Sequence, residues 1–128
     1  MTANAIPDGY GTVTPWIICK DSAKLIDFLE RAFNAKELPG SRIKNPDGSI
    51  GHVEIKLGSS IIMLFDSHAS WRPTPAFLRL YVSDVDSVHA QALSCGARDG
   101  GRFKQGSRRC QRRRLHGQLF EPVQAGLG

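Results

Sequence analysis

Residues 52–66, HVEIKLGSSIIMLFD, decide the fold of this 128-residue chain. The first part, His52 to Leu57, alternates polar and apolar side chains, as a strand with one buried face does. A Gly-Ser pair then favours a turn, and Ser60 to Asp66 is an almost continuous apolar run typical of a central strand. The stretch therefore predicts two neighbouring strands of one sheet.

The preceding residues predict a further strand and a helix. Thr12 to Cys19 is rich in β-branched residues and predicts a strand, with Pro15 at an edge or outside the hydrogen-bond ladder. Asp21 or Ser22 can cap a helix, because a short side-chain oxygen accepts a hydrogen bond from a first-turn amide. The apolar stripe of this predicted helix consists of Leu25, Phe28, Leu29, Ala32 and Phe33.

A weaker strand signal fills the gap between this helix and the opening stretch. Lys36 to Lys44 predicts a strand that Pro39 and Gly40 interrupt. Residues 45–48, NPDG, predict a turn, because proline fixes φ and glycine supplies positive φ. The first half of the chain therefore predicts the order strand, helix, strand, strand, strand.

The same order begins again after residues 68–75, which are interpreted as a linker. Phe77 to Val82 predicts a strand, and Ser83 or Asp84 is placed to cap a helix that ends at Gly96. The stripe of this second helix consists of Val85, Val88, Ala92 and Cys95. The tripeptides at 33–35 and 95–97 occupy matching places 62 residues apart. An internal duplication is the economical hypothesis.

The positive charge is concentrated in residues 98–128. The net charge of +5 divides into nine basic and ten acidic residues up to position 97, and eight basic and two acidic residues beyond it. Five arginines crowd positions 108–114 with no aromatic residue among them, which does not favour a nucleic-acid surface. Strand alternation also stops at residue 98. Either the segment is a native tail, or a reading-frame slip near codon 98 has replaced the original sequence.

Composition excludes several other classes. The 41% hydrophobic and 23% charged residues are ordinary for a globular protein. The longest apolar run is far shorter than the roughly 20 residues of a membrane helix, and residues 1–10 lack a secretory signal pattern. We therefore expect a cytoplasmic protein with neither a membrane nor a nucleic acid as partner. Cys19, Cys95 and Cys110 are too few and too widely spaced for a disulfide framework or a zinc site.

Five short motifs together indicate a family. In chain order they are Ile26-Asp27-Phe28-Leu29, Arg31-Ala32-Phe33, His52-Val53-Glu54, Ile61-Ile62-Met63-Leu64, and Leu80-Tyr81-Val82 before Asp84-Val85-Asp86. In this order and spacing they resemble the vicinal-oxygen-chelate superfamily, which includes glyoxalase I, bleomycin-resistance proteins and extradiol dioxygenases. Within the superfamily, the resemblance points to the PhnB-like branch. It covers residues 7–97.

The resemblance implies an α+β fold in which paired βαβββ modules form a curved, barrel-like mixed sheet with the helices outside. It implies one domain over residues 1–128 and a homodimer whose modules enclose a pocket. The expected parts are an arm at 1–11, a first module at 12–67, the linker at 68–75, and a second module at 76–128 whose tail at 98–128 is atypical.

The resemblance also implies where a metal would bind. It places ligand positions at Thr14, Met63 and Phe77, with a fourth in the tail. Phenylalanine has no donor atom, threonine is a poor neutral ligand, and a thioether prefers soft copper. We therefore expect no metal and no cofactor, and hence no Lewis-acid mechanism of the glyoxalase or dioxygenase type.

The inward side of the implied cup suggests ligand-binding residues. They are Trp16, His52, Glu54, Met63, Phe77, Arg79 and Tyr81. Five of them have an alternative role. His52 and Glu54 are candidate acid and base or a polar sheet surface, and Arg79 either clamps an anion or pairs with Glu54. Trp16 and Tyr81 either stack on a ligand or serve packing.

Three functions follow from these residues. The preferred hypothesis is a metal-independent binder of small molecules. The first alternative is a lyase or isomerase of the same superfamily that uses His52 and Glu54 as acid and base. The second is a vestigial domain with no ligand.

Overall fold

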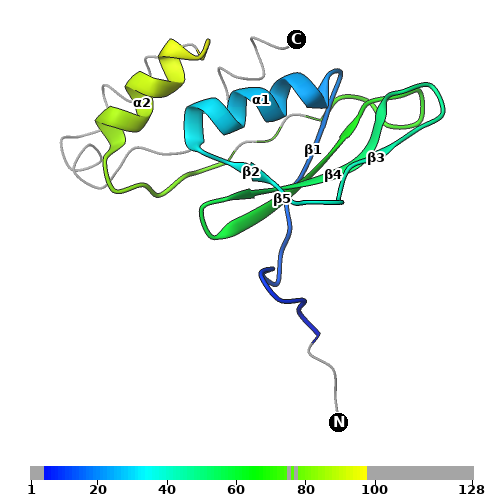
Figure 1. Cartoon of the computed structure of the whole chain (residues 1–128), viewed down its shortest axis with the longest axis horizontal. Helices are drawn as coiled ribbons and strands as arrows, with labels where there is room; N and C mark the ends of the chain where they lie inside the picture. Colours follow the sequence, from blue (N-terminus) through cyan, green and yellow to red (C-terminus); the bar gives the residue numbers. More distant parts are fainter. Residues whose placement is uncertain (1–4, 75, 77, 98–128) are drawn as a thin grey trace.

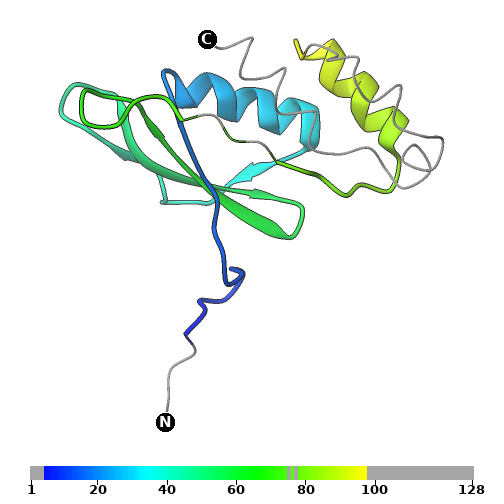
Figure 2. The same ribbon diagram turned by 180° about the vertical axis from the view of Figure 1, so that it is seen from behind.

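A computed structural model describes residues 5–74, 76 and 78–97. Its elements form a sheet with both helices on one side (Figure 1). The N-terminal arm leaves from the other side, and the reverse view agrees (Figure 2). In chain order the elements are β1 (Trp16–Cys19), α1 (Ser22–Phe33), β2 (Lys36–Glu37), β3 (Ile43–Lys44), β4 (Ile50–Leu57), β5 (Ser60–Asp66) and α2 (Val85–Ser94).

The sheet is mixed and has the order β1-β5-β4-β2, with β3 also paired to β4. The hairpin of β4 and β5 is antiparallel and turns at Gly58, whose φ of +60° suits glycine. β1 runs parallel to β5 and starts at Trp16, later than the predicted Thr12. Pro15 lies just before it and lacks the N–H that a ladder needs, although its carbonyl accepts from the amide of Met63 at 3.0 Å. The predicted strand, helix, strand, strand, strand order is confirmed.

The weak strand predicted at Lys36–Lys44 forms two short pieces. β2 and β3 both pair with β4, and the chain between them contains Gly40 at φ +75°. The predicted NPDG turn is also confirmed. The amide of Gly48 donates to the carbonyl of Asn45 at 2.9 Å, and Gly48 has a φ of +89°.

The core lies between α1 and the near face of the sheet. Leu25, Ile26 and Leu29 of the helix and Ile17, Val53, Ile55 and Leu64 of the strands are each at most 2% exposed. Burying such a side chain contributes roughly 1.5–3 kcal/mol to stability. These residues therefore form the hydrophobic core that holds α1 on the sheet.

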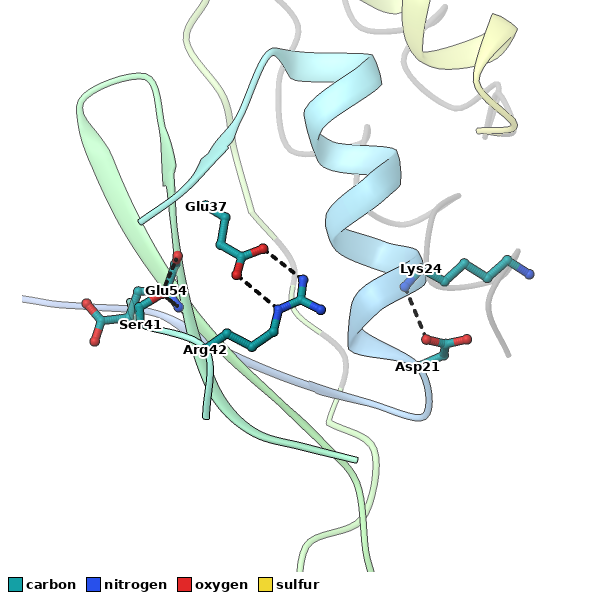
Figure 3. A network of polar contacts seen from close by, with 6 residues as sticks. All are labelled: Asp21, Lys24, Glu37, Ser41, Arg42 and Glu54. Carbon is teal, nitrogen blue, oxygen red and sulfur yellow. Dashed lines mark hydrogen bonds and ion pairs between the residues drawn. The ribbon is translucent and has the colours of Figure 1, made fainter. Parts of the chain in front are cut away.

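Polar groups secure the start of α1. A carboxylate oxygen of Asp21 accepts from the amide of Lys24 at 3.1 Å, as the sequence predicts for an N-cap (Figure 3). Asp66, at the end of β5, accepts from the amides of Ser22 at 2.7 Å and Ile50 at 2.8 Å. One carboxylate thus joins the helix, β4 and β5.

The second helix confirms its predicted cap and contacts the first. Asp84 accepts from the amide of Ser87 at 3.1 Å. Gln91 donates to the carbonyl of Arg31 in α1 at 2.7 Å. Asn34, at φ 59°, directly follows α1, and Gly96, at φ 111°, follows the last residue of α2 after the cap Cys95. A buried alanine comes next in both places. These matching ends agree with the duplication, which stays a hypothesis.

The strand predicted at Phe77–Val82 is wrong within the described residues 78–82, which have no regular secondary structure. Side-chain pattern alone does not make a strand, because a strand needs a hydrogen-bonded neighbour. Before this segment, Thr74 forms an isolated bridge with Ile18 of β1. Phe77, like residues 98–128 and the two hypotheses about them, lies outside the described residues.

None of the helices in the described part of the chain is long and apolar enough to cross a membrane.

Candidate functional site

The sheet presents one face to the helices and a second face, here called the distal face, away from them. Strand register places Trp16 beside Met63, and Met63 beside Glu54, so these three side chains share a face. The distal face is defined by Trp16, Ile18, His52, Glu54, Lys56, Ile61, Met63 and Phe65. Four residues predicted to bind a ligand, Trp16, His52, Glu54 and Met63, are therefore brought together.

Aromatic rings cluster at one end of the distal face. The indole of Trp16 lies 5.5 Å from the His52 ring and 5.6 Å from the Phe65 ring, measured between centroids. The ring of Trp71, which follows β5 in the chain, lies 6.1 Å from the Phe65 ring between centroids, at an interplanar angle of 89°. Trp16 is 45% exposed and Trp71 is 57% exposed. Large apolar rings therefore remain accessible beside polar groups.

A short turn positions Trp71. His68 and Trp71 exchange two backbone hydrogen bonds, each 2.9 Å long, which close residues 68–71 into a tight loop. The His68 ring also lies 6.1 Å from that of Phe65. The segment interpreted as a linker thus supplies an ordered part of the aromatic cluster.

Next to the rings, Glu54 accepts two side-chain hydrogen bonds. Nε2 of His52 lies 2.8 Å from Oε2 of Glu54, and the hydroxyl of Tyr10 donates to Oε1. The bonds from His52 and from Tyr10 lower the pKa of Glu54 below its ordinary value. The bond to Glu54 in turn raises the pKa of Tyr10. Near neutral pH Glu54 is therefore a carboxylate that accepts from a protonated phenol and lies within hydrogen-bond distance of the His52 ring.

Ser41 secures the backbone of β4 at Glu54. The hydroxyl of Ser41 accepts from the amide of Glu54 at 3.1 Å and lies 3.3 Å from its carbonyl oxygen. Figure 3 shows the Glu54 carboxylate directed away from the ion pair of Glu37 and Arg42. That pair is bidentate, with N to O distances of 2.7 and 3.0 Å. The two carboxylates consequently have separate partners.

The N-terminal arm takes part in the site. Tyr10 follows a turn in which its amide donates to the carbonyl of Pro7 at 3.1 Å. Gly9, at φ +87°, lies close to the side chain of Ile61 on the distal face. The turn thereby brings the phenol to Glu54, 44 residues away in sequence.

The remaining predicted residues lie elsewhere. Arg79 and Tyr81 line a cavity of about 580 Å³ with Phe33, Ile62 and Val88. Ile62 faces the helices, so this cavity is on the helix side of the sheet. Because residues 78–82 are not a strand of the sheet, alternation does not turn Arg79 and Tyr81 toward the distal face. Glu54 has His52 and Tyr10 as partners instead of Arg79.

The donors present do not fit the metal of the resembled family. Met63 lies on the distal face beside Trp16, and Trp16 follows Thr14 by two residues. Phe77 lies outside the described residues. Threonine and thioether donors are poor ligands for a divalent ion of the hard or borderline class. In the described ranges, His, Cys, Asp and Glu form no group of three or more with metal-binding geometry.

Sequence reasoning missed Tyr10 and Trp71. Each lies in a segment without periodicity, so alternation gives no sign of the face that it contacts. No local pattern marks either residue, because single exposed aromatic side chains are common on protein surfaces. Cys19 plays no part in the site. Burial raises the pKa of its thiol, which keeps it protonated and unreactive.

The sequence is similar to uncharacterized mycobacterial proteins. Mb0911c of Mycobacterium bovis and Rv0887c of Mycobacterium tuberculosis are each 32% identical over 96 residues, or 66% of this chain. The chain spans 62% and 55% of their lengths, respectively. No family model matches the chain.

A solved structure decides the fold. The fosfomycin resistance protein FosX of Listeria monocytogenes superposes with a TM-score of 0.54 over 72% of this chain and 74% of its own, at 18% identity. The chain has the vicinal-oxygen-chelate fold. Its described part contains one βαβββ module with a mixed sheet, together with α2. A PhnB protein from Bacillus cereus has a TM-score of 0.46 at 18% identity, covering 63% of this chain and 72% of its own. The assignment to the PhnB-like branch stays a prediction.

Proposed function

We propose that this chain binds a small molecule on the distal face of its sheet, without the metal of the superfamily. The observation that carries the proposal is the accessible cluster of Trp16, His52, Glu54 and Met63, joined by Phe65 and Trp71. Such a mixture of apolar walls and few polar groups is typical of small-molecule sites.

The distal face has the properties of a binding surface because its polar groups are already arranged. Glu54 is fixed by Ser41 through its backbone and by His52 and Tyr10 through its carboxylate. A pre-arranged group loses little conformational freedom when a ligand arrives. Trp16, 45% exposed beside it, offers apolar surface that a ligand would remove from water.

The metal-free part of the proposal rests on donor chemistry. A structure of FosX is described as a complex with Mn(II) and a dihydroxypropylphosphonic acid. Thr14 and Met63, at the positions that the resemblance assigns to ligands, are ill suited to Mn(II), which prefers oxygen and imidazole donors. Binding here therefore depends on the side chains themselves.

A thermal-shift screen with a metabolite library tests the proposal, with and without a chelator. We expect ligands that raise the melting temperature of the wild type equally in both buffers and that fail to stabilise Trp16→Ala. Tyr81→Ala, which changes the helix-side cavity, is the matched control and should keep the shift. A ligand that needs added Mn²⁺, Fe²⁺, Ni²⁺ or Zn²⁺, or one that tolerates Trp16→Ala, would contradict the proposal.

A second candidate is the lyase or isomerase predicted to use His52 and Glu54 as acid and base. In the form that the geometry favours, His52 exchanges the proton and Glu54 orients its ring. The 2.8 Å bond between them favours it, because Glu54 orients the imidazole through Nε2 and leaves Nδ1 for proton exchange. The lowered pKa of Glu54 makes it an orienting carboxylate in such a reaction, not the acid. Turnover of hemithioacetals or catechols that Glu54→Gln abolishes while ligand affinity persists would favour this candidate over a binder. If no compound in the library binds and none is turned over, the result would favour a vestigial domain with no ligand.

We further propose that the molecule is a cytoplasmic homodimer of the PhnB-like branch, with the barrel-like cup completed by a second module. The exposure of Trp16 and Trp71 supports the second half-cup, because a further module over the distal face would remove their apolar surface from water. Light scattering in solution should give twice the chain mass. A stable monomer that still binds the ligand would contradict the dimer.

A further inference from the structure

The distal face carries a feature that points to the class of its ligand. Trp16 and Trp71 both contact the ring of Phe65, at interplanar angles of 72° and 89°. Both are edge-to-face contacts, the arrangement that aromatic pairs prefer, and the electron-rich face of an exposed aromatic ring attracts cations such as quaternary ammonium groups. Both indoles are also about half exposed, so the rings are accessible to a solute.

The charge beside these rings is negative. The carboxylate of Glu54 lies next to His52, which contacts Trp16 at 5.5 Å. Lys56 is one step further along the same face of β4, on the side away from His52. The hydrogen bonds that lower the pKa of Glu54 keep its charge at physiological pH. Each carboxylate oxygen that already accepts one bond retains a free lone pair.

We propose that the distal face binds organic cations, with the half-exposed indoles of Trp16 and Trp71 contacting the cationic group and Glu54 supplying the opposite charge. This deepens the proposed function and rests on it. A neutral apolar ligand would gain the same ring contacts but no charge attraction from Glu54. An anionic ligand would be repelled by Glu54. Because Arg72, next to Trp71 in sequence, would attract an anion, the test must include an anionic solute.

The test uses three solutes of matched shape and different charge: choline, 3,3-dimethylbutan-1-ol and 3,3-dimethylbutanoate. The sequence contains two tryptophans, and both belong to the cluster. In ¹⁵N-labelled protein the two indole N–H signals therefore report this surface alone. We expect both signals to shift with choline, and choline to bind five- to thirty-fold more tightly than the alcohol.

Two variants separate the charge from the rings. Glu54→Gln should reduce choline affinity three- to tenfold while leaving the alcohol unchanged, and Glu37→Gln, the same change at a carboxylate paired with Arg42, should alter neither. Trp16→Ala should remove the choline response of the Trp71 signal. Circular dichroism confirms that each variant is folded.

Equal affinity for choline and the alcohol, or tighter binding of 3,3-dimethylbutanoate, would overturn the inference. If library ligands bind in a Trp16-dependent way but are neutral or anionic, only the cation assignment fails and the proposed function stands. If no solute and no library ligand binds, both fail.

Discussion

The two faces of the sheet carry side chains from the same strands but differ in chemistry. On β4 and β5 the helix-facing residues Val53, Ile55, Ile62 and Leu64 are at most 4% exposed. Their immediate neighbours His52, Glu54, Met63 and Phe65 are half-buried and include a carboxylate and an imidazole. Alternation along a strand therefore lets one element serve stability on one face and recognition on the other.

The largest expected effect tests the helix-facing side. Leu64→Ala removes a side chain that is 0% exposed and should lower the free energy of unfolding by about 3 kcal/mol. Met63→Ala, one residue earlier on the distal face, should cost about 1 kcal/mol because its side chain is half-buried. Urea denaturation measures both. Equal losses would remove the distinction between the faces.

Asp66 tests how the helix-facing side is anchored. Asp66→Ala leaves the amides of Ser22 and Ile50 without their acceptor and should cost about 2 kcal/mol. The control is Asp47→Ala in the exposed turn, where water replaces the lost acceptor and the cost should be about 0.5 kcal/mol. Thermal unfolding gives both values. A loss at Asp66 no larger than that at Asp47 would contradict the anchoring role.

Trp16 tests the distal side. Trp16→Ala should weaken ligand binding at least tenfold, about 1.4 kcal/mol, while Arg79→Ala on the helix-side cavity should change it less than twofold. Isothermal titration calorimetry provides the affinities. A larger loss of affinity in Arg79→Ala than in Trp16→Ala would indicate that the ligand binds in the helix-side cavity.

The smallest expected effect is a pH dependence from Glu54. Its pKa is lower in the folded chain, so its stabilising contribution is complete above the ordinary glutamate pKa of about 4.3. That contribution is lost as pH falls through the lower folded value. Glu54→Gln should flatten this part of the profile of unfolding free energy, and Tyr10→Phe should reduce it. A profile unchanged by Glu54→Gln would show that the hydrogen bonds to Glu54 do not affect stability.

The regular parts of the fold follow from the sequence because local chemistry decides them. The observed bounds of β5, Ser60–Asp66, are those predicted. This strand, the cap at Asp21 and the turn at Gly48 each depend on residues close in the chain. The segment at 78–82 did not follow, because its apolar pattern lacked a paired neighbour. Four of the seven predicted ligand-binding residues meet on one face because alternation along paired strands places them there.

Tyr10 and Trp71 show what such reasoning cannot reach. Each joins the distal face through a turn, formed at Pro7 and Tyr10 in one case and at His68 and Trp71 in the other. A turn directs the chain in three dimensions without leaving a periodic pattern. Contacts between irregular segments and a sheet are therefore visible only in the structure.

The most direct test of the distal face as the binding site uses its methionine. The sequence contains two methionines, Met1 and Met63, so a methyl-labelled sample gives two methionine signals in a carbon-proton NMR spectrum. A saturating concentration of a ligand found by thermal shift should change the chemical shift of the Met63 methyl signal without reducing its intensity. A saturating ligand that leaves Met63 unmoved while shifting amides of residues 78–82 would contradict the account.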